Sequence, residues 1–259
     1  MPVTPTKFGV VIVVGGPQCR IGSHRQFVLL ARLLGQRGIT TLRFDYRGMG
    51  DSSGDLRDFT AIDEDIRAAV DILKSANPKL ETIVLWGLCD AASASLFYAY
   101  KDPRIAGLVL ANPWVRTDVG EAQAYLNHYY RARFLDSAFW KKMLRGQFDF
   151  FGSLRSFFAT IRKAMRKTAP ESGDRELPLR ERMYASWANF SGDVLVLLSG
   201  EDLTAQEFLN MVKASSQWRE LLDGPRVTKH NMPSANHTFS RDEWRDEVAN
   251  ATANWILAL

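Results

Sequence analysis

The sequence predicts an α/β fold in which a mostly parallel β-sheet is covered by helices on both faces. Short apolar runs rich in β-branched residues, suited to buried parallel strands, alternate with segments whose apolar residues recur at helical spacing. One long segment, both basic and aromatic, interrupts the alternation and predicts an inserted, mainly helical cap. The expected core comprises residues 1–113 and 191–259, and the expected cap comprises residues 114–190.

Six apolar segments predict the strands. In chain order they are residues 9–15, 40–46, 81–87, 105–111, 193–200 and, more weakly, 227–231. Their length and their content of Val, Ile and Leu are typical of strands buried on both faces. We therefore expect the carboxyl ends of these strands to share one edge of the sheet.

Helical periodicity fills the intervals between the strands. In the first helix the apolar residues recur at i, i+3, i+4 and i+7: Phe27, Leu30, Ala31 and Leu34. A second apolar stripe, at residues 62–73, follows Thr60, which we expect to be its N-cap. Near the C-terminus, Ser240 and Glu243 have the spacing of a capping box ahead of the last helix.

The composition is that of one ordinary globular domain. The chain has 259 residues, of which 46% are hydrophobic and 24% charged, so it can bury one large core. Two cysteines are too few for a disulfide framework, which favours a reducing, cytoplasmic location. The N-terminus lacks the features of a signal peptide, and no apolar run approaches the roughly 18 residues of a membrane span. We therefore expect a soluble protein.

The predicted cap differs in chemistry from the rest of the chain. Residues 131–167 include ten Lys or Arg residues but only two acidic residues, both Asp, although the whole chain has a net charge of only +4. Such a segment could close over an apolar, acyl-sized pocket, or it could rest peripherally on the anionic inner membrane. We expect the lid. Nucleic acid is not an expected partner, because no recognised binding module accompanies the charge.

The stretch WGLCDAAS, residues 86–93, has the form of a nucleophile elbow with Cys89 as the nucleophile. Gly87 and Ala91 flank it at a strand-to-helix junction, where small residues relieve the crowding of a sharp turn. Ala91 stands where glycine is usual. The alternative is that Cys89 is an inert buried residue, as lone cysteines commonly are.

An acid and a histidine follow in the chain order that this arrangement requires. Asp202 comes just after the fifth predicted strand, and His237 just after the sixth. Open α/β sheets bind their ligands at the carboxyl ends of the strands, so we expect Cys89, Asp202 and His237 to form a catalytic triad. Glu201 could replace Asp202, but it is longer and closer to the strand. His230, within the last predicted strand, is not expected to be the base.

Backbone N–H groups beside the elbow would complete the site as an oxyanion hole. The N–H group of Asp90 is one expected donor. The other is that of Gly16, in the loop after the first strand, because Pro17 has no N–H. The sequence predicts no metal and no cofactor.

The candidate substrate-binding residues are Gln18, Arg20, His24, Arg25 and Trp114. Three of them, Arg20, His24 and Arg25, lie on or just after the oxyanion loop, where they could meet a phosphate or carboxylate of the substrate. Alternatively, they hold the loop by pairing with acids such as Asp51. The expected ligand is a small acyl compound, and the sequence does not predict an oligomeric state.

Motifs throughout the predicted core resemble the α/β-hydrolase superfamily: GGPQ after the first strand, DYRGMGDSSG at residues 45–54, the elbow, and the acid and histidine loops. More narrowly, the chain resembles the bacterial exosortase A system-associated hydrolases of the first type. That resemblance is carried by GGPQCRIGSHRQF (15–27), RFDYRGMGDS (43–52), WGLCDAAS (86–93), SGEDLTAQEF (199–208) and NHTF (236–239). It covers nearly all of the core but not the cap. It implies a setting near genes for extracellular polysaccharide and protein sorting, not a defined substrate.

Together, the motifs predict a cysteine-nucleophile acyl hydrolase, an esterase or thioesterase. His237 would take the proton of Cys89, Asp202 would orient the imidazole, and the thiolate would attack an acyl carbonyl. The acyl-thioester could also pass to an amine, alcohol or thiol, so an acyltransferase is an alternative. A non-catalytic, membrane-associated scaffold is the alternative of a different class.

Overall fold

The computed structural model describes residues 5–16, 18–116 and 177–259. Six strands form one parallel sheet in the order β2-β1-β3-β4-β5-β6. The strands are β1 (Phe8–Val13), β2 (Thr40–Arg43), β3 (Thr82–Leu88), β4 (Ile105–Ala111), β5 (Asp193–Glu201) and β6 (Val227–Asn236). Each strand begins within one residue of its predicted start, so the predicted parallel α/β sheet is confirmed.

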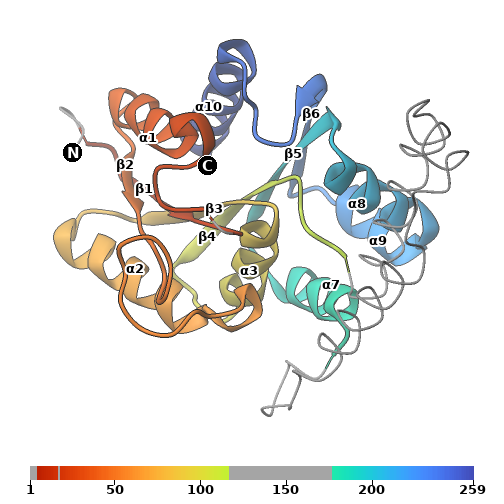
Figure 1. Cartoon of the computed structure of the whole chain (residues 1–259), viewed down its shortest axis with the longest axis horizontal. Coiled ribbons are helices and arrows are strands. Elements are labelled where there is room, and N and C mark those ends of the chain that lie inside the picture. The colour runs from red at the N-terminus through yellow and green to blue at the C-terminus, as the bar shows by residue number, and fades with distance from the viewer. Residues whose placement is uncertain (1–4, 17, 117–176) are drawn as a thin grey trace, which may run out of the picture. The chain divides into compact units, whose positions relative to one another are not determined.

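Helices cover both faces of the sheet (Figure 1). The described helices are α1 (Gln26–Gln36), α2 (Asp63–Ala76), α3 (Asp90–Ala99), α7 (Leu179–Asn189), α8 (Leu203–Ala214), α9 (Ser216–Leu222) and α10 (Asp242–Leu257), with short 3₁₀ turns η1 (Ser23–Arg25) and η2 (Phe59–Ala61). Alternate strand residues point to opposite faces. Leu85 and Leu108 belong to one apolar cluster, together with residues of α2, α3, α7, α8 and α9, whereas Val84 and Val109 belong to the other, with residues of α1 and α10.

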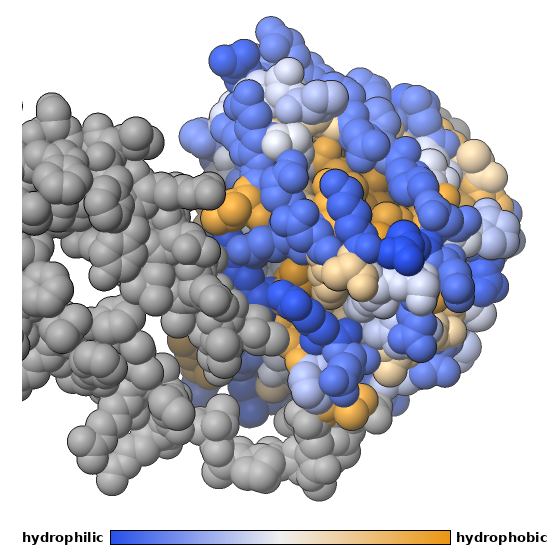
Figure 2. Space-filling view, turned by 90° about the vertical axis from the view of Figure 1, so that its right-hand side faces the viewer, coloured by the Kyte–Doolittle hydropathy of each residue, from blue (hydrophilic) through white to orange (hydrophobic). Residues whose placement is uncertain are grey.

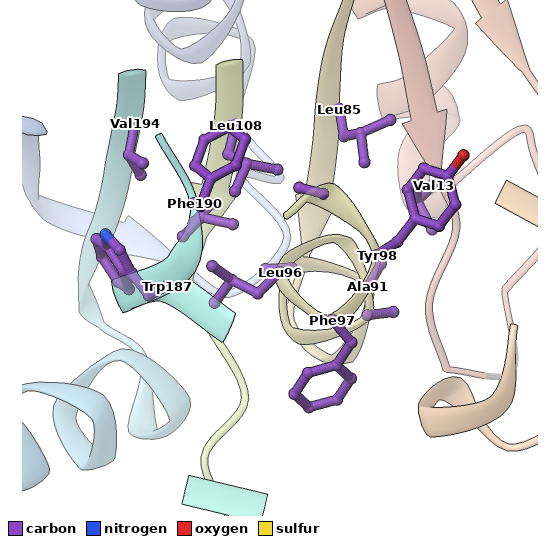
Figure 3. Close-up of a cluster of buried hydrophobic side chains, with 14 of the residues drawn as sticks. Val13, Leu85, Ala91, Leu96, Phe97, Tyr98, Leu108, Trp187, Phe190 and Val194 are labelled. Atoms are coloured by element: carbon purple, nitrogen blue, oxygen red, sulfur yellow. The ribbon is translucent and has the colours of Figure 1, made fainter. Parts of the chain in front are cut away.

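Helix α3 lies within the larger of the two apolar clusters. Every residue from Ala91 to Ala99 is buried, because the helix is built of small and apolar residues. In Figure 3, Leu96 of this helix lies among Leu108, Trp187 and Phe190. A helix packed on all sides has little freedom to move. The position of its N-terminus, which Cys89 precedes, is therefore set by the core.

Residues 179–190, which the sequence analysis counted with the cap, pack with the core instead. The described residues from 179 onward belong to one compact unit with the described residues up to 115. Within this unit, Met183 and Trp187 of α7 are buried, and the Trp187 ring lies 6.1 Å from that of Trp218. The buried face of α7 also contains Arg182 and Ser186. Because half of that face is polar, its periodicity does not stand out in the sequence.

Two predicted helix caps are wrong. Thr60 lies in η2, where its N–H and hydroxyl groups both donate to the Asp58 carboxylate. Arg241 precedes α10 without a side-chain cap, and Ser240 instead exchanges two hydrogen bonds with Asn236. In both cases the hydroxyl residue bonds to another side chain and not to the N-terminus of the helix.

Figure 2 shows one side of the molecule on which the described surface is mostly hydrophilic, with apolar residues in separate patches. Within the described parts of the chain, no helix combines the length and the hydropathy needed to cross a membrane. The basic aromatic segment, residues 131–167, lies outside the described residues. The lid and the membrane contact assigned to it therefore stay predictions.

Candidate active site

Cys89 lies in a sharp turn between β3 and α3, in the strand-turn-helix setting that the sequence predicts. Its backbone has φ 63° and ψ −124°, a combination that residues with a side chain rarely adopt. Its N–H donates to the Ala111 carbonyl at 2.9 Å, and its carbonyl accepts from the N–H groups of Ala92 (3.1 Å) and Trp114 (3.2 Å). A backbone of this kind costs about 1–3 kcal/mol, so the surrounding bonds must hold it.

Small neighbours make the turn possible. A Cβ at Gly87 would lie 2.5 Å from the backbone of Ala91, closer than real side chains approach. Ala91 itself is fully buried, so its methyl group fills the position where glycine is usual. The crowding around the turn explains the small residues that the sequence places on either side of Cys89.

Asp202 and His237 meet at the ends of the adjacent strands β5 and β6. His237 Nδ1 lies 3.0 Å from Asp202 Oδ2, at ion-pair distance but not aligned as a hydrogen bond. The N–H groups of Thr204 and Ala205 donate to the Asp202 carboxylate at 3.2 and 3.1 Å, as at a helix N-cap. The Asp202 side chain is 6% exposed and that of His237 33%. The acid is thus held in place while the imidazole stays within reach of a substrate.

Asn112, just after β4, joins the acid and histidine loops, and the sequence analysis did not identify it. It is fully buried and has a left-handed backbone, with φ 43°. Its Nδ2 donates to Ser199 Oγ at 2.9 Å and to the His237 carbonyl at 3.3 Å, and its Oδ1 accepts from the Ser199 N–H at 2.9 Å. Ser199 Oγ in turn donates to the Asn236 carbonyl at 3.0 Å. An Asn in the fourth strand's exit loop was the one available sequence signal.

The two predicted oxyanion donors both act on the side chain of Asp90. The Gly16 N–H donates to Asp90 Oδ2 at 2.7 Å, so in this structure it is not free for a substrate oxygen as the sequence analysis expected. Burial raises the pKa of the Asp90 carboxyl, and the N–H groups of Gly16, Ala91 and Asp90 itself partly offset that effect. The carboxylate of Asp90 therefore occupies one donor, the Gly16 N–H, that would stabilise a tetrahedral intermediate.

Arg20 forms the pairing that the sequence analysis gave as the alternative to substrate binding. Its guanidinium pairs with Asp45 and, at 2.6 Å, with Asp51, and its backbone N–H donates to Asp45 at 2.5 Å. Arg43 donates to the Arg20 carbonyl at 2.5 Å. The Asp45 side chain is 1% exposed, so the cluster ties the loop after β1 to the loop after β2.

The remaining candidate substrate residues lie in different settings. His24 and Arg25 are exposed and have left-handed backbones, with φ 52° and 61°, at the junction of η1 and α1. Oε1 of Gln18 is buried and accepts no hydrogen bond from the described residues. Trp114 touches the elbow, because its carbonyl accepts from the hydroxyl of Ser93 at 2.7 Å while its N–H donates to Cys89.

Neither the alternative acid nor the alternative base takes part in the pair formed by His237 and Asp202. Glu201 is exposed at the end of β5, and His230 lies within β6, as predicted, with its Nε2 2.8 Å from Glu247 Oε1. The described residues contain no group of three or more His, Cys, Asp or Glu residues that could hold a metal ion. The chemistry that this arrangement can perform is proton transfer and nucleophilic attack by side chains.

Comparisons with known proteins agree on the fold. The sequence profile of the alpha/beta hydrolase family matches residues 10–251. An esterase from Pyrococcus furiosus superposes with a TM-score of 0.66 at 14% identity, over 98% of this chain and 82% of the esterase. A monoacylglycerol lipase from Paleococcus ferrophilus superposes with a TM-score of 0.60 at 21% identity, over 98% of this chain and 96% of the lipase. A metagenome-derived lipolytic enzyme superposes with a TM-score of 0.60 at 14% identity, over 99% of this chain and 96% of the enzyme. Among curated proteins, no sequence matches.

Proposed function

Because the chain belongs to the alpha/beta hydrolase family, we propose that it cleaves acyl esters or thioesters with Cys89 as its nucleophile. The observation that carries the proposal is the strained backbone of Cys89 at the end of β3, with φ 63° and ψ −124°. A buried structural cysteine needs no such turn, whereas a nucleophile must be raised above the sheet edge. His237 and Asp202, paired at the ends of β5 and β6, supply a base and its orienting acid.

The proposed reaction begins with proton transfer from Cys89 Sγ to His237 Nε2. The thiolate attacks the carbonyl carbon, the carbonyl oxygen becomes an oxyanion, and collapse expels the leaving alkoxide or thiolate, which takes the proton from His237. Asp202 holds the imidazole orientation through Nδ1. Water, deprotonated by His237, then attacks the acyl-thioester and releases a carboxylic acid and free Cys89. The N-terminus of α3, which begins at Asp90, favours the anionic thiolate.

Acyl transfer is the second candidate activity, and it follows from the thiol itself. An acyl-thioester remains reactive toward amines, alcohols and other thiols, so the acyl group could pass to an acceptor instead of water. The nucleophile and base are the same in both reactions. The narrower resemblance to the exosortase A system-associated hydrolases adds a proposed setting but no acceptor. A scaffold without catalytic activity is the alternative that a lack of any acyl-enzyme would favour.

A panel of p-nitrophenyl esters and acyl thioesters tests the proposal with the full chain. We expect the wild type to cleave at least one member, and Cys89→Ala to lose the activity about 1000-fold or more. Cys19→Ala is the matched control, since it removes the other free cysteine and should keep the activity. Added hydroxylamine or glycine ethyl ester would be acylated if transfer competes with hydrolysis. Equal rates for wild type and Cys89→Ala would refute the nucleophile.

A further inference from the structure

Asp90, the residue directly after Cys89, carries a carboxylate that no cation neutralises within the described parts of the chain. Its Oδ2 accepts from the Gly16 N–H at 2.7 Å and its Oδ1 from the Ala91 N–H at 2.9 Å. No described Lys, Arg or His forms an ion pair with it. Carboxylates taken out of water are usually paired, because burying an isolated charge is costly. An unpaired one beside a nucleophile therefore needs an explanation.

One further acid, Asp58, acts on the Asp90 carboxyl. Burial, with a further contribution from the charge of Asp58, raises the pKa of the Asp90 carboxyl. Burial and the negative charges of Asp90, Asp58 and Asp65 raise the pKa of Tyr46 to about 12. Tyr46 is therefore an uncharged phenol at neutral pH. Asp65 is paired with Arg47 at 2.9 Å and Asp58 makes only a minor contribution, so the group that favours a positive charge beside Cys89 is the Asp90 carboxylate itself.

The Asp90 carboxylate also blocks part of the oxyanion hole. A Cβ at Gly15 would lie 2.0 Å from Asp90 Oδ1, so the carboxylate rests directly against the backbone of the loop after β1. The Gly16 N–H has one hydrogen, and it is directed at Asp90 Oδ2. A substrate oxygen can use this donor only by competing with Asp90 Oδ2 for it. A cation bound to Asp90 would make Oδ2 a weaker acceptor and so favour that exchange.

We propose that Asp90 binds an ammonium group carried next to the acyl carbonyl, so that the substrates are α-aminoacyl esters or thioesters. This inference rests on the proposed function and names its substrate class. The ammonium group donates to the Asp90 carboxylate, and the Gly16 N–H turns to the carbonyl oxygen that Cys89 attacks. Charge-assisted hydrogen bonds of this kind are stronger than neutral ones. Only a substrate with the cation in place completes the oxyanion hole, so Asp90 couples recognition to reactivity.

The test compares two benzyl thioesters of nearly equal shape, L-alanyl and 2-methylpropanoyl, in which an ammonium group replaces a methyl group. We expect wild-type kcat/KM to favour the alanyl compound about 100-fold, within the range that one well-placed polar contact provides. Asp90→Asn keeps the size and an acceptor for the Gly16 N–H but removes the charge, and it should reduce the preference to about threefold or less. Asp58→Asn is the matched control. It also removes an acidic charge near Asp90, and it should retain the preference.

The outcomes separate this inference from the proposed function. If neither thioester is cleaved and Cys89 gains no acyl mass, the proposed function fails. If the wild type cleaves both with equal kcat/KM, the proposed function stands and the ammonium site is refuted. Equal losses on both thioesters in Asp90→Asn would also refute it, because Asp90 would then act only through loop geometry. Should that variant not fold, wild-type inhibition decides: L-alaninamide should inhibit at least tenfold more strongly than 2-methylpropanamide, and equal inhibition overturns the proposal.

Discussion

Asp45 and Asp90 are both carboxylates held against the loop after β1, but among the described residues only Asp45 has a cation as its partner. Asp45 lies in the loop after β2, is 1% exposed at its side chain, and binds the guanidinium and the N–H of Arg20. Asp90, at the start of α3, accepts from backbone N–H groups only among the described residues. A fully paired carboxylate contributes to stability and is not available to a ligand. An unpaired one lowers stability and can bind a ligand.

The candidate site residues at the sheet edge likewise divide into those whose polar groups are fully paired and those with a group available to a ligand. Arg20 was a candidate for substrate binding, yet two acids already hold it. His237 has one acidic partner, and a third of its side chain is exposed, so its second ring nitrogen can act on another group. Substitutions on the two sides should therefore differ in kind. Changes around Asp45 should reduce stability, and changes around Cys89 should reduce activity.

The largest expected effect is the loss of activity when Cys89 or His237 is replaced. Cys89→Ala and His237→Ala should each reduce acyl-enzyme formation by about three orders of magnitude or more, because one unit generates the nucleophile. The double variant should add little to either single loss. Burst-phase kinetics with an activated ester measure this. Losses that multiply, instead of saturating, would show that the two residues act independently. Urea unfolding should place all three variants within about 1 kcal/mol of the wild type.

On the structural side, Asp45→Asn should lower the free energy of unfolding by about 3 kcal/mol, because it breaks an ion pair whose acid is buried. Asp51→Asn is the control. Asp51 pairs with the same arginine, but its side chain is 81% exposed, so its loss should cost less than about 1 kcal/mol. Urea denaturation gives both values. Equal effects of the two changes would mean that burial does not distinguish these carboxylates.

Replacing Asn112 should affect both stability and activity, because Asn112 is buried like a structural residue but contacts the histidine loop. Asn112→Ala removes hydrogen bonds to Ser199 and to the His237 carbonyl. We expect a loss of about 1–3 kcal/mol in stability and about a tenfold drop in kcat with KM nearly unchanged. Steady-state kinetics per folded molecule separate the two. A stability loss with full kcat would show that Asn112 holds the sheet edge without positioning His237.

The smallest change in stability is expected for Asp90→Asn. Because the folded-state pKa of Asp90 is raised, its ionisation disfavours folding, and this cost develops as the pH rises from below about 4 through the folded-state pKa. The variant should therefore match or exceed the wild type by up to about 1 kcal/mol at neutral pH. At pH below about 4 the difference should disappear. A variant less stable than the wild type at pH 7 by more than 1 kcal/mol would mean that the charge of Asp90 is compensated.

The sequence predicted the sheet and the positions of Cys89, Asp202 and His237, because strands, turns and chain order are local patterns. It could not predict where side chains with several available partners would bind. Arg20 binds Asp45 of another loop, a contact that depends on how the two loops meet in space, and Thr60 binds Asp58, the local partner that the predicted cap overlooked. The occupation of the Gly16 N–H by Asp90 joins residues 74 positions apart, so no local pattern contains it. The role of Cys89, like that of His237, stays a prediction.

The mass of the intact protein after brief exposure to an activated ester tests the central claim most directly. Acylation should add the mass of one acyl group, and peptide mapping should place it on Cys89. His237→Ala should reduce the adduct strongly, whereas Cys19→Ala should not change it. We predict a single Cys89 adduct that decays as free acid appears. An adduct confined to Cys19, or none with any ester or thioester of the panel, would contradict the account.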